Sequence, residues 1–371
     1  MSHRTTPGMP LTGLLALLLI SIGCSTWVGN AQSATRLSLR AYSAIAWSPD
    51  GSRFFAVGSP SFSDYAQLFL VDATSGEETQ LTEAPGRYSF PRWSPDGSSL
   101  AMTVNFDEIH LFKPATRQET LLTTGEASVW LNDGNTLAIY VGGLSSLWPD
   151  QREVRLVSKE GDAQEVVFAG PVIHDMLAVA TAAARATPDF LTPSAPLPRE
   201  YVEGMTWIRT EETLLFTIRA STSGSVSQQA VLVDLNSPSY VAFPGEQNIG
   251  EVASSPDGTL LAYVRLNGLG LGEALVIADV SGDCLSVLEL AEGLQSPTWS
   301  PDGSRIAFLI DGRIHVRTLA KEQKAPKVPA MLARQVGVGR LTTRWSRPGQ
   351  LRQNGFKLLS RRWPGGSSRG R

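Results

Sequence analysis

The 371-residue sequence contains only two cysteines, Cys24 and Cys284, and four histidines. Two cysteines exclude a disulfide-dense scaffold and a zinc site built from C-x-x-C pairs. The histidines form no H-x-H or H-E-x-x-H pattern and stand at His3, His110, His174 and His315. We therefore expect no metal and no other cofactor, and we interpret His110 and His315 as strand-face residues.

Long hydrophobic runs are scarce as well. The apolar run Leu11–Gly23 spans 13 residues, which is too short for a membrane helix of about 20 residues and typical of a signal-peptide core. Two processing sites remain open. The tetrapeptide Ser21-Ile22-Gly23-Cys24 resembles a lipobox and predicts lipidation of Cys24, whereas cleavage after Ala31 would release a soluble protein. Both routes modify or remove Cys24, so we expect no structural disulfide.

Segments with helical periodicity are few, and a short turn motif recurs instead. The motif is Trp-Ser-Pro-Asp-Gly or a variant of it, with its aspartate at Asp50, Asp96, Asp133, Asp257 and Asp302. The intervals between these aspartates are 46, 37, 124 and 45 residues. Proline presets the second turn position, glycine supplies a positive φ, and Ser and Asp side chains bond nearby amides. We therefore interpret these aspartates as structural turn residues rather than catalytic or metal-binding ones.

Each motif is followed by short alternating strands, and a period of about 40–45 residues with four strands per unit is that of a propeller blade. The first unit is predicted at 44–47, 53–57, 66–72 and 78–81. The last unit lacks a fourth strand, which residues 36–39 can supply, closing the ring. We predict six blades and leave a seventh, degenerate blade open at about 169–202. Within that stretch, Val172–Ala180 is compatible with a strand.

The repeated motif, the Leu-Ala or Ile-Ala pair after it, and Gln80-Leu81-Thr82 resemble the repeats of TolB-like, WD-like β-propellers. The resemblance covers about 36–318 and implies an all-β, six-bladed propeller with four antiparallel strands per blade. It says little about function, because such propellers serve many roles. The remaining segments are a signal peptide at 1–24, a tether at 25–35 and a tail at 319–371.

The tail differs sharply from the body in charge. Residues 319–371 hold 13 basic residues and one acid, whereas residues 1–318 hold 19 basic and 34 acidic residues. The overall net charge of −3 hides a body near −15 and a tail near +12. We interpret the tail as a disordered extension, and an acidic propeller disfavours nucleic acid as the partner.

These patterns favour an exported, non-enzymatic binding propeller at the bacterial cell envelope. We expect a monomer that lies in the periplasm or on the outer surface and is held by a lipid anchor. Its partner is an envelope protein or a glycan. The loops that join fourth to first strands and second to third strands meet on one face around the channel. We expect binding residues there: Arg40, Tyr42, Arg87, Tyr88, Asp107, Trp148 and Glu246.

Two alternatives remain open. One is a glycan-binding propeller, and the other is an envelope hydrolase or lyase with its site in the central funnel. The enzyme alternative predicts converging carboxylates or histidines with perturbed pKa values. Related propellers precede an α/β-hydrolase domain in prolyl-oligopeptidase-like peptidases, and the 53 residues after Thr318 are too few to house that domain.

Overall fold

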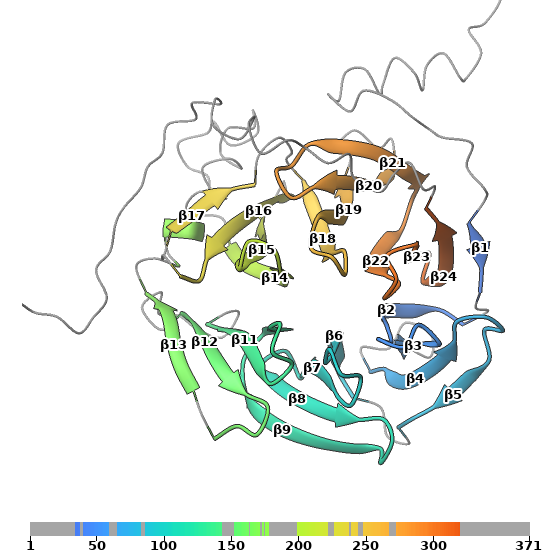
Figure 1. Ribbon diagram of the computed structural model, residues 1–371, viewed down its shortest axis with the longest axis horizontal. Coiled ribbons are helices and arrows are strands. Elements are labelled where there is room, and N and C mark those ends of the chain that lie inside the picture. The colour runs from blue at the N-terminus through green and yellow to red at the C-terminus, as the bar shows by residue number, and fades with distance from the viewer. Residues whose placement is uncertain are drawn as a thin grey trace, which may run out of the picture.

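The computed structural model describes residues 34–37, 40–58, 65–82, 86–142, 152–162, 164–170, 173, 175–177, 199–221, 226–236, 239–243, 248–266 and 272–319. These residues form six four-stranded antiparallel sheets arranged in a ring (Figure 1). The predicted all-β, six-bladed propeller is therefore confirmed.

The first three blades follow each other directly along the chain. Blade 1 contains β2 (Tyr42–Trp47), β3 (Arg53–Gly58), β4 (Gln67–Asp72) and β5 (Glu78–Gln80). Blade 2 contains β6 (Tyr88–Trp93), β7 (Leu100–Val104), β8 (Glu108–Lys113) and β9 (Gln118–Thr124). Blade 3 contains β10 (Ala127–Trp130), β11 (Thr136–Val141), β12 (Glu153–Ser158) and β13 (Gln164–Ala169).

The other three blades complete the ring. Blade 4 contains β14 (Arg199–Ile208), β15 (Thr213–Ser221), β16 (Val226–Asp234) and β17 (Ser239–Ala242). Blade 5 contains β18 (Ile249–Ser254), β19 (Leu260–Leu266), β20 (Glu273–Asp279) and β21 (Cys284–Ala291). Blade 6 contains β22 (Leu294–Trp299), β23 (Arg305–Ile310), β24 (Arg313–Thr318) and β1 (Thr35–Arg36).

The ring is closed by a strand from the start of the propeller, as the sequence predicts. β1 lies beside β24 in Figure 1, and its two residues pair with Val316 and His315. The backbone N–H of Leu37 extends this pairing with a 2.8 Å bond to the Ile314 carbonyl oxygen. Both ends of the ring therefore share one blade, which covers the outer edge of β24.

The recurrent motif forms a tight turn between the first and second strands of its blade. In blade 1 the Ser48 hydroxyl donates to Asp50 Oδ1 at 2.6 Å, and the Ser52 N–H donates to the same oxygen at 3.0 Å. The Gly51 N–H bonds the Ser48 carbonyl at 2.9 Å, and Gly51 has a φ of 73°. Glycine is required here because other residues adopt this φ only with strain. The predicted structural role of the aspartate fits this geometry.

The motif also connects neighbouring blades. The Trp93 indole N–H donates to the Ala46 carbonyl of blade 1, and the Trp130 indole N–H donates to the Arg92 carbonyl of blade 2. A Cβ on Gly97 would lie 3.7 Å from the ring of Pro49, so each turn also packs against the turn before it. The same residues therefore form the turn and the seam between blades.

Hydrophobic cores lie between blades rather than within them. The consecutive residues Phe54 and Phe55 are both fully buried, and they point to opposite sides of β3 because side chains alternate along a strand. Phe54 packs with blade 6 residues such as Leu309, whereas Phe55 packs with blade 2 residues such as Phe112. Each blade is thus stabilised by both neighbours.

Blade 4 departs from the motif, and this departure gives a stability prediction. Glu211 occupies the position of the motif glycine, and the positive φ falls on the next residue, Glu212, whose φ of 48° strains a residue with a side chain. Its carboxylate accepts a 2.8 Å hydrogen bond from Asn236, which is exposed to water. Glu212→Gly is expected to raise the free energy of unfolding by about 0.5–1 kcal/mol, measured by urea denaturation.

The matched control is Glu212→Ala, which removes the same hydrogen bond and keeps the strain. This variant is expected to be no more stable than the natural protein. Equal stabilisation by both substitutions would contradict the explanation by backbone strain.

The segment between β13 and β14 includes a correction. Ile173 and residues 175–177 are helical, so the strand that we expected over Val172–Ala180 is wrong. The apolar residues Ile173, Met176 and Leu177 recur with helical spacing and are 2%, 3% and 0% exposed in the core between blades 3 and 4. Ala169 ends β13 and Arg199 begins β14, so both ends of the expected insertion belong to blades.

Cys284 begins β21 and is disulfide-bonded in the full-length chain, which corrects our expectation of no structural disulfide. The sequence contains one other cysteine, Cys24, which lies outside the described residues. No helix among the described residues is long and apolar enough to cross a membrane.

Candidate functional site

The two faces of the ring carry different loops. Because the strands are antiparallel, the turns between first and second strands lie on one face, which we call the turn face. The loops from second to third strands and from fourth to first strands lie on the other, which we call the loop face. Arg40, Arg87 and Asp107 lie in such loops, and Tyr42 and Tyr88 begin β2 and β6. The predicted Trp148 and Glu246 lie outside the described residues.

Arg40 and Tyr42 form a closed cluster within blade 1. Arg40 Nε lies 2.9 Å from Glu78 Oε2, and its guanidinium carbon lies 4.6 Å from the centre of the Phe69 ring. Tyr42 is only 4% exposed and meets Phe69 edge-on at 6.1 Å. Burial, with help from Glu78, raises the pKa of Tyr42 far above its ordinary value. Tyr42 therefore packs in the core beside Phe69 and offers little surface itself.

Arg87 lies between two exposed aromatic rings. Its guanidinium carbon is 5.3 Å from the centre of the Tyr65 ring and 5.1 Å from that of Phe106. Tyr65 comes from the β3–β4 loop of blade 1 and is 49% exposed, and Phe106 comes from the β7–β8 turn of blade 2 and is 57% exposed. A cavity of about 210 Å³ is lined by Arg87, Tyr88, Ser89 and Phe106. We call Tyr65, Arg87, Tyr88 and Phe106 the Arg87 cluster.

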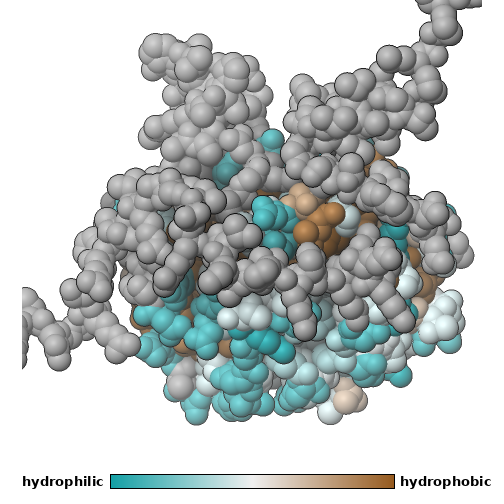
Figure 2. Space-filling model, turned by 45° about the horizontal axis from the view of Figure 1, so that its top comes forward, coloured by the Kyte–Doolittle hydropathy of each residue, from teal (hydrophilic) through white to brown (hydrophobic). Residues whose placement is uncertain are grey.

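Few large hydrophobic side chains are exposed elsewhere among the described residues. The uncovered surface in Figure 2 is mainly hydrophilic, with hydrophobic side chains limited to small areas. The other exposed large hydrophobic residues are Leu121, Val166, Val241 and Leu290. They lie singly on the outermost strands of four blades. The Arg87 cluster therefore differs from its surroundings in combining two exposed rings with a cation.

The sequence did not reveal Phe106, because the binding residue predicted in this turn is its neighbour Asp107. Asn105 and Phe106 have φ values of 52° and 79°, a backbone conformation rarely adopted by an aromatic residue. The Asn105 N–H is held 3.0 Å from the Arg87 carbonyl, and its side chain donates to Glu108 at 3.1 Å. Such strain costs about 1–3 kcal/mol and concentrates at functional sites. The sequence Asn-Phe-Asp is the signal from which this turn could have been predicted.

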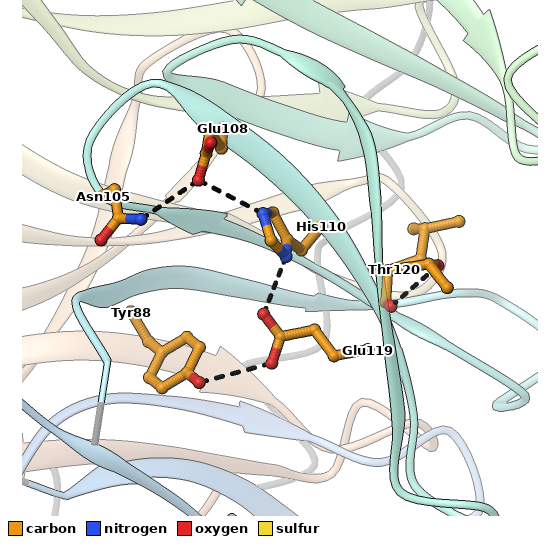
Figure 3. Close-up of polar contacts among 7 residues, drawn as sticks. Tyr88, Asn105, Glu108, His110, Glu119 and Thr120 are labelled. Atoms are coloured by element: carbon orange, nitrogen blue, oxygen red, sulfur yellow. Dashed lines mark hydrogen bonds and ion pairs between the residues drawn. The ribbon is translucent and has the colours of Figure 1, made fainter. Parts of the chain in front are cut away.

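A polar network in blade 2 contacts the Arg87 cluster at Tyr88 (Figure 3). The Tyr88 hydroxyl donates to Glu119 Oε2 at 3.3 Å, and the other oxygen of Glu119 lies 2.7 Å from His110 Nδ1. Glu108 lies 3.4 Å from His110 Nε2 on the far side of the ring. Burial and the Glu119 charge raise the pKa of Tyr88 to about 12, so its hydroxyl stays protonated and donates. His110, expected as a strand-face residue, lies between Glu108 and Glu119, the second of which accepts the hydrogen bond of the Tyr88 hydroxyl.

The central channel holds a second set of charged groups that the sequence did not predict. Arg92 of blade 2 and Glu251 of blade 5 interact electrostatically across the channel, and the structure gives them no ion-pair contact. Desolvation by the surrounding protein raises the pKa of Glu251, although the residue is in contact with water. The charge of Arg92 and a hydrogen bond from the Ser296 N–H oppose this shift. Glu251 therefore has the perturbed pKa that the enzyme alternative predicts.

Glu203 of blade 4 adds a second carboxylate to the channel region. It raises the pKa of Glu251 further and is itself held by Arg219 at 3.0 Å and by the amide of Gln228. Within the part of the chain that the structure describes, no three His, Cys, Asp or Glu side chains are placed to hold a metal ion.

Comparison with known proteins gives similarity mainly at the level of the fold. No protein-family profile matches the sequence. An uncharacterised peptidase of Bacillus subtilis, YuxL, is 45% identical over 62 residues. That match spans 17% of this chain and 9% of the relative.

Among solved structures, an oligogalacturonate lyase from Vibrio parahaemolyticus is 14% identical, with a TM-score of 0.50 over 81% of this chain and 97% of its own. A putative TolB from Agrobacterium tumefaciens is 17% identical, with a TM-score of 0.49 over 76% and 91% of the two chains. At these identities the likeness concerns the fold alone. The six four-stranded blades and their recurrent turns confirm the predicted TolB-like propeller architecture.

Proposed function

We propose that this chain is an exported binding propeller that takes a protein partner through the Arg87 cluster on its loop face. The observation that carries this proposal is the placement of Arg87 between two half-exposed aromatic rings from adjacent blades. Aromatic residues and arginine dominate the binding energy of protein interfaces because they combine a large apolar area with directional bonds. The cavity beside Phe106 can accept an apolar side chain of the partner.

The cluster is well held before any partner arrives. Tyr88 is fixed by Glu119, the turn that carries Phe106 is bonded to the Arg87 backbone, and both rest on paired strands. A surface that is already ordered loses little conformational entropy on binding, so more of the contact energy appears as affinity. The acidic body adds electrostatic selection of the partner.

Site-specific crosslinking in cells tests this function. A photoreactive phenylalanine analogue at position 106 is expected to capture one protein partner, and the same analogue at Arg117, in the β8–β9 turn on the turn face, is expected not to. In that background Arg87→Ala should reduce the crosslinked product at least about tenfold, because an interface arginine of this kind contributes about 2 kcal/mol or more. Unfolding temperature should stay unchanged.

Arg87→Lys serves as the matched control, since it keeps the charge and loses the planar group that stacks on the rings. It should give an intermediate yield. Equal crosslinking from positions 106 and 117, or full capture by Arg87→Ala, would remove the cluster from the proposed site.

The proposed location is the cell envelope, with a lipid on Cys24 as the anchor. This part of the proposal rests on the signal-like run Leu11–Gly23 and the lipobox-like sequence before Cys24. A sulfur that carries a lipid thioether cannot also form a disulfide with Cys284. Mass spectrometry of the mature protein should therefore find diacylglyceryl-Cys24 at its N-terminus. An N-terminus at Gln32, or a Cys24–Cys284 disulfide, would overturn the anchor.

A further inference from the structure

The turn face of the ring holds a funnel that the proposed function does not use. It is a cavity of about 420 Å³ around the channel axis, lined by the ends of the first strands and by the turns of all six blades. This volume lies within the range of about 300–1,000 Å³ that is typical of sites for small molecules. We call it the turn-face funnel.

The tryptophan rings of the funnel present apolar surface because their polar hydrogens are already bonded. The five tryptophans that line it all donate their indole N–H within the protein: Trp47 to Gly51, Trp93 to Ala46, Trp130 to Arg92, Trp207 to Asn132 and Trp299 to Ala253. Trp93 and Trp207 are the ones that expose part of their rings, whereas the other three are 5–7% exposed. The rings of Trp93 and Trp207 therefore offer apolar surface to a ligand, and their indole N–H groups are not available to it.

The charged groups of the funnel are all of one sign. Among the described residues that line it, Arg92 and Arg209 are charged, and none carries a carboxylate. This is unexpected in a body with 34 acidic and 19 basic residues. Arg209 is exposed and uses Nε to bond Asn132 Oδ1 at 2.8 Å, which leaves its two terminal nitrogens available.

Arg92 lies deeper and is poorly satisfied. One terminal nitrogen donates to the Pro91 carbonyl at 3.1 Å, and no carboxylate forms an ion pair with it. Glu251 faces it from the opposite blade, beyond the residues that line the funnel. A partly desolvated guanidinium with unused donors is a strong site for a carboxylate, which it binds through two parallel hydrogen bonds.

We propose that the turn-face funnel binds a carboxylate carried on an apolar, aromatic or aliphatic body, with the carboxylate on Arg92 and the body against Trp93 and Trp207. The ligand can be a free organic acid or the C-terminal residue of a peptide, because both present the same group. Glu251 limits the affinity by competing for the charge of Arg92.

Titration calorimetry on the natural full-length chain tests this site with 3-phenylpropanoate and its neutral amide. The acid is expected to bind at least about tenfold more tightly than the amide, because the amide lacks the charge-assisted bonds. Arg92→Gln should abolish this preference. It should not unfold the protein, since the bond between blades uses the Arg92 backbone carbonyl, and the side chain bonds only the carbonyl of the adjacent Pro91. Arg117→Gln, which removes an exposed arginine from the outer β8–β9 turn, should leave binding unchanged.

Glu251→Gln gives a readout that a purely structural role would not produce. Removal of the opposing carboxylate should tighten acid binding several-fold and leave amide binding unchanged. Weaker or unchanged acid binding in this variant would contradict the proposal.

The two sources of carboxylate are separated by a second pair of probes, Gly-Gly-Phe with a free or an amidated C-terminus. Acid-selective, Arg92-dependent binding of the peptide but not of 3-phenylpropanoate would identify a peptide end as the ligand, and the reverse would identify a free acid. Absence of binding by both acids, or equal binding of acids and amides, would overturn the proposal. Arg87→Ala should not affect these titrations, so the proposal for the funnel and the proposal for the Arg87 cluster are tested independently.

Discussion

Phe55→Ala is expected to lower the free energy of unfolding by about 3–5 kcal/mol, the usual cost of removing a fully buried phenylalanine. Phe55 is 0% exposed and packs in the seam between blades 1 and 2. Its ring meets Trp93 at 6.4 Å and Phe112 at 6.0 Å, and both partners belong to blade 2. Truncation leaves a cavity that a closed ring cannot easily collapse, because every blade is held by two neighbours.

Urea denaturation of the natural protein and the variant measures this effect. Phe55→Leu is the matched control and should cost clearly less, since it keeps most of the apolar volume. Tyr65→Ala removes an exposed ring and should leave stability within about 0.5 kcal/mol. A Phe55→Ala protein as stable as the Phe55→Leu protein would show that the seam between blades contributes little.

Stability is expected to fall steeply below about pH 4 because the five turn aspartates all have lowered pKa values. In Asp302, hydrogen bonds from the Ser300 and Ser304 side chains hold the pKa of the carboxyl well below its usual range. In Asp133 and Asp257, burial raises the pKa, but the hydrogen bonds from neighbouring residues outweigh it. The folded state therefore favours the ionised form in every turn.

The sign of the pH dependence follows from linkage. A group whose pKa is lower in the folded state contributes stability that is complete above its ordinary pKa and is lost as pH falls through the folded value. Five such groups titrate in the same acidic range, so their losses add. Denaturation curves should give a constant free energy of unfolding from pH 7 to about pH 5, and then a steep decline toward pH 2.

Asp302→Asn isolates one of these contributions. At pH 7 the variant should be less stable by about 1 kcal/mol, a modest cost because the turn is exposed and water competes for its hydrogen bonds. Near pH 2 the difference should shrink, because Asp302 then binds a proton in the unfolded natural protein more readily than in the folded one, where its pKa is lowered. A constant difference across this range would contradict the role of the ionised carboxylate.

The repeat and its turn could be predicted from the amino-acid sequence, and so could a ring of six blades with a seventh left open. Each copy of the motif forms its turn from residues within five positions of each other, such as Ser48, Asp50 and Gly51, so local sequence is sufficient. Alternating strands and the missing fourth strand of the last unit also predicted closure by β1. The strand expected over Val172–Ala180 failed because periodicity in a short apolar segment is ambiguous between strand and helix.

Which side chains meet in the candidate sites became clear from the folded ring alone. Tyr65 and Arg87 are 22 residues apart and belong to different blades, and Phe106 reaches Arg87 because of a left-handed turn that no single residue type announces. Arg92 and Glu251 are 159 residues apart, and they face each other because a ring of six blades places blades 2 and 5 on opposite sides of one channel. Turns are specified by local hydrogen bonds, whereas a site in a propeller depends on which side chains different blades bring together, and spacing along the sequence does not encode these contacts.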